Sequence, residues 1–394
     1  MLYRKNQNGG DLSQLGFGCM RFPRKGVGID IAKSAEMVHS AIEKGVNYFD
    51  TAYMYPGSED ALGRILSKEM RGKINIATKM PCFFVRSSSD FDKYFNEQLK
   101  RLQTDYIDYY MLHSIFDFNY YDKMRGLGIN EWLEKEKERG RIKNTGFSYH
   151  GRSDEFIKII DEYDWNFCMI QYNYLDENYQ AGKTGLKYAH GKNIPVIAME
   201  PLRGGTLASK MPDSALREFN NINKERTPAE WALRWLWNQP EVTVVLSGMG
   251  SQAQVSENIA AASDAQVGMM TEPELEAIKN VTQIMRSNIR VNCTGCNYCM
   301  PCPASVDIPS AFSRYNESAM VGKLEALMQY IMTAGVFAAS PQFASQCVKC
   351  GKCEKLCPQH INIMRELENA AKYFEPFWVK AAVSLARRFT KIKK

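Results

Sequence analysis

Long apolar runs are missing from this chain of 394 residues. Its first residues contain no apolar stretch of the kind that forms a secretion signal. No segment reaches the roughly 18 to 20 uninterrupted apolar residues that a membrane-spanning helix requires. These absences argue against a secreted or membrane-spanning protein, so we expect a cytoplasmic protein without a transmembrane segment.

Excess charge is also scarce, except in one short segment. The formal net charge is +6, and residues 374–394 hold six cations against a single acid, Glu375. The remaining residues are close to neutral, so the sequence offers no basic groove and we expect no nucleic-acid partner. We expect this basic amphipathic tail, 374–394, to be a loose, solvated terminus. The alternatives are peripheral contact with an anionic membrane or with an acidic electron-transfer partner.

Short β-branched runs alternate with amphipathic helical segments from residue 13 to 263. The strand-like runs cover 15–21, 46–52, 75–80, 107–113, 143–148, 167–173, 195–200 and 242–248. Eight strand–helix pairs in about 250 residues have the count and size of a (β/α)8 TIM barrel, an α/β fold. A doubly wound sheet is the rival, but no GxGxxG follows the first strand, which counts against it.

Polar side chains stand at the ends of several predicted strands. In such a barrel the chemistry lies at the carboxyl ends of the strands, where Asp50, Tyr55, Lys79 and His113 fall. A free tyrosine titrates near pH 10, and a nearby ammonium group lowers that pKa. We therefore interpret Tyr55 as a proton donor, Lys79 as the group that tunes it, Asp50 as the residue that holds Lys79, and His113 as the residue that orients a carbonyl oxygen.

Eight of the eleven cysteines form two tight groups. The first reads C-x2-C-x2-C-x2-C, and the second reads C-x2-C-x2-C-x3-C; their members are Cys293, Cys296, Cys299 and Cys302, then Cys347, Cys350, Cys353 and Cys357. The second group has the bacterial ferredoxin spacing, in which three thiolates bind one cluster and the fourth reaches the other. Zinc is the alternative, although zinc sites usually use two separated cysteine pairs. The spacing therefore favours two [4Fe–4S] clusters.

The remaining cysteines, Cys19, Cys82 and Cys168, are most simply buried thiols. For Cys82, which follows Lys79 closely, the alternative is a place in the lining of the active-site pocket. After about residue 265 strand alternation stops, a helix is expected over 271–287, and the region 304–346 is helical in pattern. We expect four parts: a barrel over 1–265, a connecting helix over 266–290, a small helical ferredoxin-like iron–sulfur domain over 291–373, and the tail over 374–394.

The first 290 residues or so resemble the aldo/keto reductase family. Asp50, Tyr55, Lys79 and His113 resemble its catalytic tetrad, and FDTAYMYPGSEDALGRIL, GRIKNTGFS, IQYN, MEPLRGG and VLSGMGSQAQVSEN resemble its signatures. The resemblance implies that a nicotinamide cofactor is bound by Ser148, Gln171, Met199, Ser247, Gly248, Gln254, Glu257 and Asn258.

Four positions depart from the family pattern. Gly248 and Gln254 stand where the family carries a lysine and an arginine around the 2′-phosphate of NADP(H). Met199 replaces an aromatic residue that stacks on the nicotinamide, and Tyr149 replaces an asparagine that holds its carboxamide. The choice among NAD(H), NADP(H) and FMN therefore stays open.

Three functions remain. The first is an oxidoreductase that reduces a small carbonyl compound, or a related unsaturated one, with electrons entering or leaving through the two clusters. The second is an FMN-containing barrel that exchanges electrons with a ferredoxin or flavodoxin partner, because flavin joins two-electron and one-electron chemistry. The third is a non-catalytic electron carrier, which the four residues of the tetrad disfavour.

Overall fold

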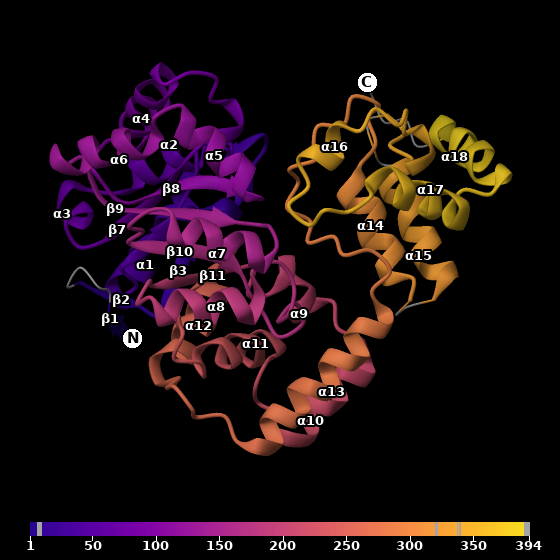
Figure 1. The fold of residues 1–394 in the computed structure, drawn as a ribbon. Helices are drawn as coiled ribbons and strands as arrows, with labels where there is room; N and C mark the ends of the chain where they lie inside the picture. The colour runs from indigo at the N-terminus through magenta and orange to yellow at the C-terminus, as the bar shows by residue number, and fades with distance from the viewer. Residues whose placement is uncertain (6–9, 320–321, 337, 339, 390–394) are drawn as a thin grey trace. The chain divides into compact units, whose positions relative to one another are not determined.

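The computed structural model describes residues 1–5, 10–319, 322–336, 338 and 340–389, and at 386, 388 and 389 it describes the backbone alone. The chain forms two compact units (Figure 1). Unit 1 comprises Met1–Leu202 and Lys224–Ile278, and unit 2 comprises Arg203–Asn223 and Lys279–Lys394.

Unit 1 is built around a closed barrel of eight parallel strands, as the sequence predicted. The order around the barrel is β3, β6, β7, β8, β9, β10, β11 and β12. These strands are β3 (Leu15–Gly18), β6 (Tyr48–Asp50), β7 (Asn75–Met80), β8 (Ile107–Ile115), β9 (Ile142–Tyr149), β10 (Phe167–Gln171), β11 (Val196–Met199) and β12 (Val242–Ser247). Neighbouring strands pair in parallel, so their carboxyl ends meet on one face.

Aromatic side chains fill the interior of the barrel. The ring of Tyr109 lies between those of Tyr48 and Phe167, edge to face, with centroid distances of 5.3 and 5.1 Å. These residues are fully or almost fully buried, and together with Met111 and Val244 they form a core inside the strands. The barrel is therefore a packed scaffold that leaves the polar residues at its rim for chemistry.

Helices surround the strands and bury their apolar faces against them. Those of unit 1 are α1 (Ile31–Glu43), α2 (Ser58–Ile65), α3 (Lys68–Arg71), α4 (Ser89–Leu102), α5 (Phe118–Gly126), α6 (Ile129–Glu138), α7 (Ser153–Asp161), α8 (Gly182–Gly191), α11 (Pro228–Trp237) and α12 (Gln252–Asp264). Thr227 caps α11, since its hydroxyl accepts a hydrogen bond from the amide of Glu230. The short 3-10 helices η1 (Cys19–Arg21) and η2 (Cys82–Phe84) follow β3 and β7.

Two small antiparallel ribbons were not expected from the sequence. They pair β1 (Tyr3–Lys5) with β2 (Asp11–Ser13), and β4 (Arg24–Lys25) with β5 (Gly28–Ile29). Strands of two or three residues are too short for a period-2 pattern to identify them. None of the helices that the structure describes has the length and apolar character needed to cross a bilayer.

Unit 2 is helical in its described part, as the pattern after residue 265 predicted. Its elements are η3 (Arg203–Gly205), α9 (Thr206–Ser209), α10 (Asp213–Ile222), α14 (Ile308–Glu317), α15 (Lys323–Tyr330), the π-helix η4 (Ile331–Val336), η5 (Ala344–Gln346), α16 (Lys352–Lys355), α17 (Ile363–Phe374) and α18 (Phe377–Phe389). The long helix α13 (Glu272–Asn288) is divided between the two units at Ile278.

The division of the chain differs from the boundaries expected at residues 265 and 290. Residues 203–223, which follow β11 and were assigned to the barrel, belong to unit 2. Arg203 donates a hydrogen bond to the side chain of Asn292, and Lys210 donates one to Ser313. These partners lie about ninety residues or more along the sequence, and no periodicity reveals such long-range pairs.

The core of unit 2 includes the tail helix α18. Tyr330 stacks on Phe374 with a centroid distance of 4.8 Å, and Val379 and Val383 of α18 are buried in the same core. The expectation of a loose, solvated tail is therefore wrong for Phe377–Phe389, because two valines four residues apart fix the helix on the unit. Lys391, Lys393 and Lys394 lie outside the described residues.

Candidate active site and cysteine motifs

Asp50 and Lys79 form a buried ion pair at the carboxyl ends of two adjacent strands, β6 and β7. The ammonium of Lys79 donates to both carboxylate oxygens of Asp50, at 2.6 and 2.7 Å, and to the carbonyl oxygen of Thr51 at 2.7 Å. These three bonds use all three N–H groups of Lys79. Desolvation lowers the pKa of Lys79 and raises the pKa of Asp50, and the ion pair opposes both shifts.

Tyr55 and His113 adjoin this pair. The ammonium of Lys79 lies 5.0 Å from the centroid of the Tyr55 ring, and the rings of Tyr55 and His113 meet edge to face at 6.0 Å. Tyr55 sits in the turn after β6, where its amide donates to the carbonyl oxygen of Ala52 and its own carbonyl accepts from the amide of Ser58. The structure thus brings together the four residues that the sequence marked as catalytic.

His113 is held in its neutral form. Its side chain is buried, and desolvation, followed by the positive charges of Lys79 and His150, places its pKa well below 6.5. A neutral imidazole near pH 7 keeps one ring N–H as a donor and does not add a second positive charge beside Lys79. This state suits a residue that donates a hydrogen bond to a carbonyl oxygen.

A second buried carboxylate supports Lys79 from the outer side of the barrel, and the sequence did not reveal it. Glu59 of α2 accepts hydrogen bonds from Thr78 at 2.6 Å and from Gln98 of α4 at 2.7 Å, and Arg101 pairs with it at 3.2 Å. Gln98 also donates to the backbone carbonyl of Lys79 at 3.0 Å. An acidic residue in the first turn of a helix is an ordinary sequence feature, so nothing in the pattern distinguished Glu59.

Three predicted cofactor residues lie at the ends of neighbouring strands β9, β10 and β11. The hydroxyl of Ser148 accepts a hydrogen bond from the amide of Ser114 at 2.8 Å. The amide nitrogen of Gln171 donates to the buried carboxylate of Asp176 at 2.9 Å, and Gln171 pairs with Met199 in the register of β10 and β11. Tyr149 is buried and donates its hydroxyl proton to the carbonyl oxygen of Arg152.

The other five predicted cofactor residues lie between the end of β12 and the first two turns of α12. Asn258 donates to the hydroxyl of Ser247 at 3.0 Å, Gln254 accepts from the amide of Gly250 at 2.8 Å, and Glu257 accepts from Thr227. Ser251 caps α12. The amides at such a helix start favour an anion.

Gly248 leaves space for Arg21, a cation that the sequence reasoning missed. A methyl group at residue 248 would come within 2.7 Å of the Cγ atom of Arg21. Arg21 follows β3, is exposed, and has no hydrogen-bond or ion-pair partner among the described residues. The family pattern places a charged residue at position 248 itself. In this chain the charge beside position 248 comes from Arg21, which lies more than two hundred residues earlier in the sequence.

The two cysteine motifs have positive φ angles at matching positions of the backbone. Two and four residues after the first cysteine φ is positive, at Gly295 (70°) and Asn297 (66°) in one motif and at Lys349 (54°) and Gly351 (71°) in the other. Three residues after the last cysteine φ is again positive, at Ser305 (58°) and at His360 (50°). The extra residue in the second motif therefore does not disturb the repeat.

The helices that follow the motifs repeat as well. Asp307 caps α14 and Asn362 caps α17, each by accepting a hydrogen bond from the amide three residues later. Ile308 and Ile363 open the two helices and are buried in the core of unit 2. Unit 2 is therefore built from two copies of a motif–helix element, as in a two-cluster ferredoxin.

The pKa of Cys299 depends on cysteines of both motifs. Burial raises the pKa of the Cys299 thiol first, and the negative charges of Cys296, Cys293 and Cys357 raise it further. Cys357 belongs to the second motif, so three thiols of one motif and the last thiol of the other share one environment. Burial raises the pKa of Cys357, and hydrogen bonds from the backbone N–H groups of Ile361, Gln359 and His360 oppose this rise.

The second motif has its own local environment. Burial and the charge of Cys347 raise the pKa of Cys353 to about 11. We call the arrangement of three thiols of the first motif with Cys357 of the second the crossed grouping. It fits the thiolate set of a dicluster site, in which bound metal offsets the clustered negative charge. In the part of the chain that the structure describes, no group of three or more histidine, cysteine, aspartate or glutamate side chains is arranged so that it could hold a single metal ion.

The lone cysteines lie in the barrel. Cys19, Cys82 and Cys168 are buried, and burial is the largest cause that raises the pKa of each thiol, to about 12 for Cys82. They were predicted to be buried thiols, and their high pKa values agree with unreactive side chains.

Comparisons with known proteins identify both parts of the chain. Residues 14–274 match the aldo/keto reductase family, and residues 292–362 match the 4Fe–4S dicluster domain. The oxidoreductase YqkF of Bacillus subtilis is 28% identical over 69% of this chain and 94% of its own, and L-galactose dehydrogenase of Arabidopsis thaliana is 30% identical over 62% and 85%. Among solved structures, aldo-keto reductase AKR11C1 of Bacillus halodurans in its holo form superposes with a TM-score of 0.60 at 26% identity, covering 71% of this chain and 96% of that one. The chain belongs to the aldo/keto reductase family, and a 4Fe–4S dicluster domain follows its barrel.

Proposed function

We propose that the barrel reduces the carbonyl group of a small molecule, with Tyr55 as the proton donor, and that the clusters carry electrons to or from this reaction. One observation carries the proposal: the buried Asp50–Lys79 pair lies against the ring of Tyr55, and the neutral ring of His113 meets the same ring edge to face. Family membership and the oxidoreductase relatives support the reaction class.

Each residue of the site has a role in this reaction. Reduction of a carbonyl to an alcohol consumes one hydride and one proton. A dinucleotide held at the start of α12 would supply the hydride. His113 donates a hydrogen bond to the carbonyl oxygen, and Tyr55 delivers the proton to that oxygen. Lys79 stabilises the phenolate that remains on Tyr55, and Asp50 keeps Lys79 charged although it is buried.

A flavin is the second candidate for the barrel. Gly248, Gln254 and Met199 leave the dinucleotide site without the charges and the aromatic face of the family pattern. Each cluster passes one electron at a time, whereas a nicotinamide gives up two as hydride, and a flavin can do both. FMN in the barrel, with a ferredoxin or flavodoxin as outside partner, accounts for these departures.

Anaerobic spectroscopy tests the proposal and separates its two forms. The purified protein is expected to show the visible absorbance of iron–sulfur clusters, and flavin bands only if FMN is bound. Addition of NADPH or NADH with a panel of aldehydes and ketones should give the alcohols. If no alcohol forms with any electron donor, dithionite-reduced carriers included, the proposal is overturned. Clusters that have been reduced with dithionite should regain their visible absorbance when carbonyl substrate is added and should stay bleached without it, which is the expected sign of electron transfer to the reaction.

A further inference from the structure

The tail helix α18 presents three different sides. Val379 and Val383 face the core of unit 2. At the helical period of 3.6 residues, Lys380, Ser384 and Arg387 form a neighbouring side, and Phe377, Trp378, Ala381, Ala382 and Leu385 form the outer side. All five residues of the outer side are exposed, with Phe377 at 93%, Trp378 at 46% and Leu385 at 56%.

The outer side is unusual for a surface in water. Phe377, Trp378 and Leu385 are large apolar residues on one helix, and contiguous exposed apolar surface of this kind marks an interaction site. The helix is not loose, because Val379 and Val383 anchor it and Arg387 donates to the backbone carbonyls of Gly335 and Ala338 at 2.6 and 2.7 Å. The apolar side is therefore held in place and still faces solvent.

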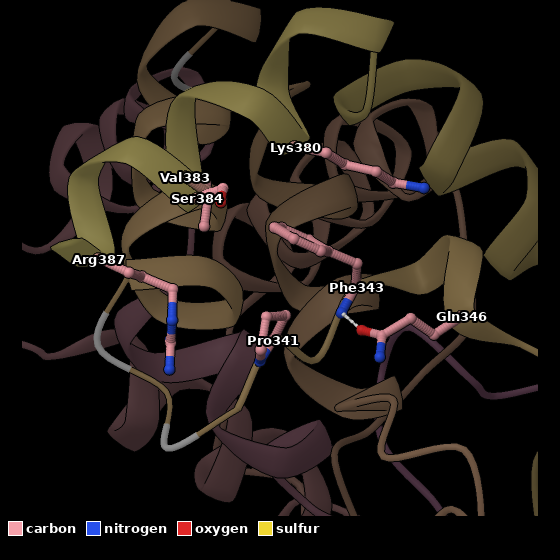
Figure 2. A pocket seen from close by; sticks show the side chains of 7 residues that line it. All are labelled: Pro341, Phe343, Gln346, Lys380, Val383, Ser384 and Arg387. Carbon is pink, nitrogen blue, oxygen red and sulfur yellow. Dashed lines mark hydrogen bonds between the residues drawn. The ribbon is translucent and has the colours of Figure 1, made fainter. Parts of the chain in front are cut away.

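A pocket of about 510 Å³ opens along the cationic side of the same helix. Figure 2 shows its lining, which consists of Pro341, Phe343, Gln346, Lys380, Val383, Ser384 and Arg387. Arg387 and Lys380 stand at opposite ends, with Phe343 and Pro341 between them. The lining thus combines two cations and an apolar floor, and contains no carboxylate.

One acid, Glu375, lies close to these cations. Glu375 lies 3.9 Å from Lys380, but its side chain is only 2% exposed and accepts hydrogen bonds from Tyr330 and from the amide of Ser345. Residues 374–394 as a whole carry six cations against this one acid. An aromatic apolar side flanked by cations is the pattern of a helix that lies in the interface of an anionic membrane.

We infer that unit 2 docks on an anionic phospholipid surface through α18. The outer side, Phe377, Trp378 and Leu385, enters the boundary between headgroups and acyl chains. The phosphodiester of one headgroup binds beside Lys380 at one end of the pocket, and the glycerol and upper acyl chain lie on Phe343 and Pro341. This inference is independent of the reaction in the barrel.

Vesicle binding by the full-length, cluster-loaded protein tests the inference. The protein is expected to float with vesicles of phosphatidylcholine mixed with phosphatidylglycerol, and to bind on the order of 10-fold more weakly to phosphatidylcholine alone or at high salt, since surface cations supply part of the attraction. Protein that stays unbound with both kinds of vesicle overturns the inference.

Paired variants locate the contact. Trp378→Glu with Leu385→Glu should abolish flotation, whereas Leu324→Glu with Met328→Glu, two exposed apolar residues of α15, should leave it unchanged. Lys380→Glu should weaken binding on the order of 10-fold, and Lys355→Glu on α16 should not, although it changes the net charge equally. Equal losses in variant and control contradict the assignment. Circular dichroism and cluster absorbance show whether each variant is folded.

Two further measurements separate the lipid from other anions. Acyl chains carrying bromine should quench the fluorescence of the parent more than that of Trp378→Phe, which keeps the apolar side. Inorganic phosphate alone, or an acidic plant-type ferredoxin, is titrated against the parent and Lys380→Glu. If either binds through Lys380 while the vesicles do not, the pocket belongs to a free phosphate or to a protein partner and the lipid assignment is wrong.

Discussion

The catalytic site of the barrel and the cysteine site of unit 2 are assembled in opposite ways. Asp50, Tyr55, Lys79 and His113 come from three strands and their loops, and buried side-chain contacts hold them together. The eight cysteines come from two short stretches of the chain, which have positive φ angles at matching positions. A site made by long-range packing depends on residues far from it in the sequence, whereas a site made by local loops depends on its own spacing.

The cysteine site departs from this local rule at Cys357, and the largest expected effect tests this departure. Cys357 shares the environment of Cys299, so Cys357→Ala should remove the cluster of the first motif and leave about four of about eight iron atoms per chain. Cys357→Ala combined with Cys293→Ala should lose no more iron than either change alone. Cys357→Ala combined with Cys347→Ala should lose both clusters.

Iron and sulfide analysis of anaerobic protein decides between the crossed and the local grouping. If Cys357→Ala with Cys347→Ala keeps one intact cluster, each motif holds its own cluster and the crossed grouping is wrong. Cys168→Ala, a buried thiol of the barrel, is the control and should keep all the iron.

In the barrel, the largest expected effect comes from Tyr55→Phe. Loss of a positioned proton donor should lower the rate of carbonyl reduction by at least about 10²-fold. Cofactor binding and iron content should not change, because the ring remains beside Lys79. Tyr53→Phe is the matched control, since the ring of Tyr53 packs on Tyr94 of α4 instead. Turnover equal to that of the parent would exclude Tyr55 as the donor.

These two sites also show what a sequence can reveal. The cysteine spacing and the eight alternating strands predicted two domains and both architectures, because each signal repeats within a few residues. The barrel-face rule then selected Asp50, Lys79 and His113 as strand-end residues. Glu59, Gln98 and Arg21 could not be found in this way, because their roles arise from contacts between α2, α4, β7 and the end of β3 that have no local pattern.

Segment 203–223 is the second case in which long-range packing decided the outcome. Gly204 has a φ of 64°, and a methyl group there would lie 1.8 Å from the carbonyl oxygen of Thr294 in the first cysteine motif. Gly351 has a φ of 71°, with nothing within 4 Å of such a methyl group. Both changes to alanine cost the strain of a left-handed residue, about 1 kcal/mol, and only Gly204→Ala adds overpacking of about 1–3 kcal/mol.

Urea unfolding followed at the cluster absorbance measures this difference. Gly204→Ala should lower the free energy of unfolding of unit 2 by about 1–3 kcal/mol more than Gly351→Ala. The same loss in both variants would mean that Gly204 does not pack on the motif in solution.

Protonation of His113 should have a smaller effect, on the free energy of unfolding of the barrel alone. Its pKa is lowered in the folded protein, while the unfolded chain takes up the proton near pH 6.5. The unfolded state therefore binds more protons as the pH falls below about 6.5, and the free energy of unfolding falls by up to about 1.4 kcal/mol per pH unit. His113→Asn should reduce this slope, and His190→Gln on α8 should not. If His113→Asn leaves the slope of unfolding free energy against pH unchanged, another group is responsible for the pH dependence.

The smallest effect that we expect concerns Arg21 and the choice of cofactor. Arg21 is exposed beside Gly248, so its attraction for a phosphate is screened by water and is worth about 0.5–1 kcal/mol, or roughly a 2- to 5-fold change in dissociation constant. Fluorescence titration of Arg21→Gln with NADPH, NADH and FMN measures it, with Arg24→Gln of β4 as the matched control. Weaker binding of NADPH alone places Arg21 at the 2′-phosphate, and equal weakening of NADPH and NADH places it at the pyrophosphate. Gly248→Ala should act in the same direction, because its methyl group displaces the Arg21 side chain. Identical constants for Arg21→Gln, Arg24→Gln and the parent would remove Arg21 from the cofactor site.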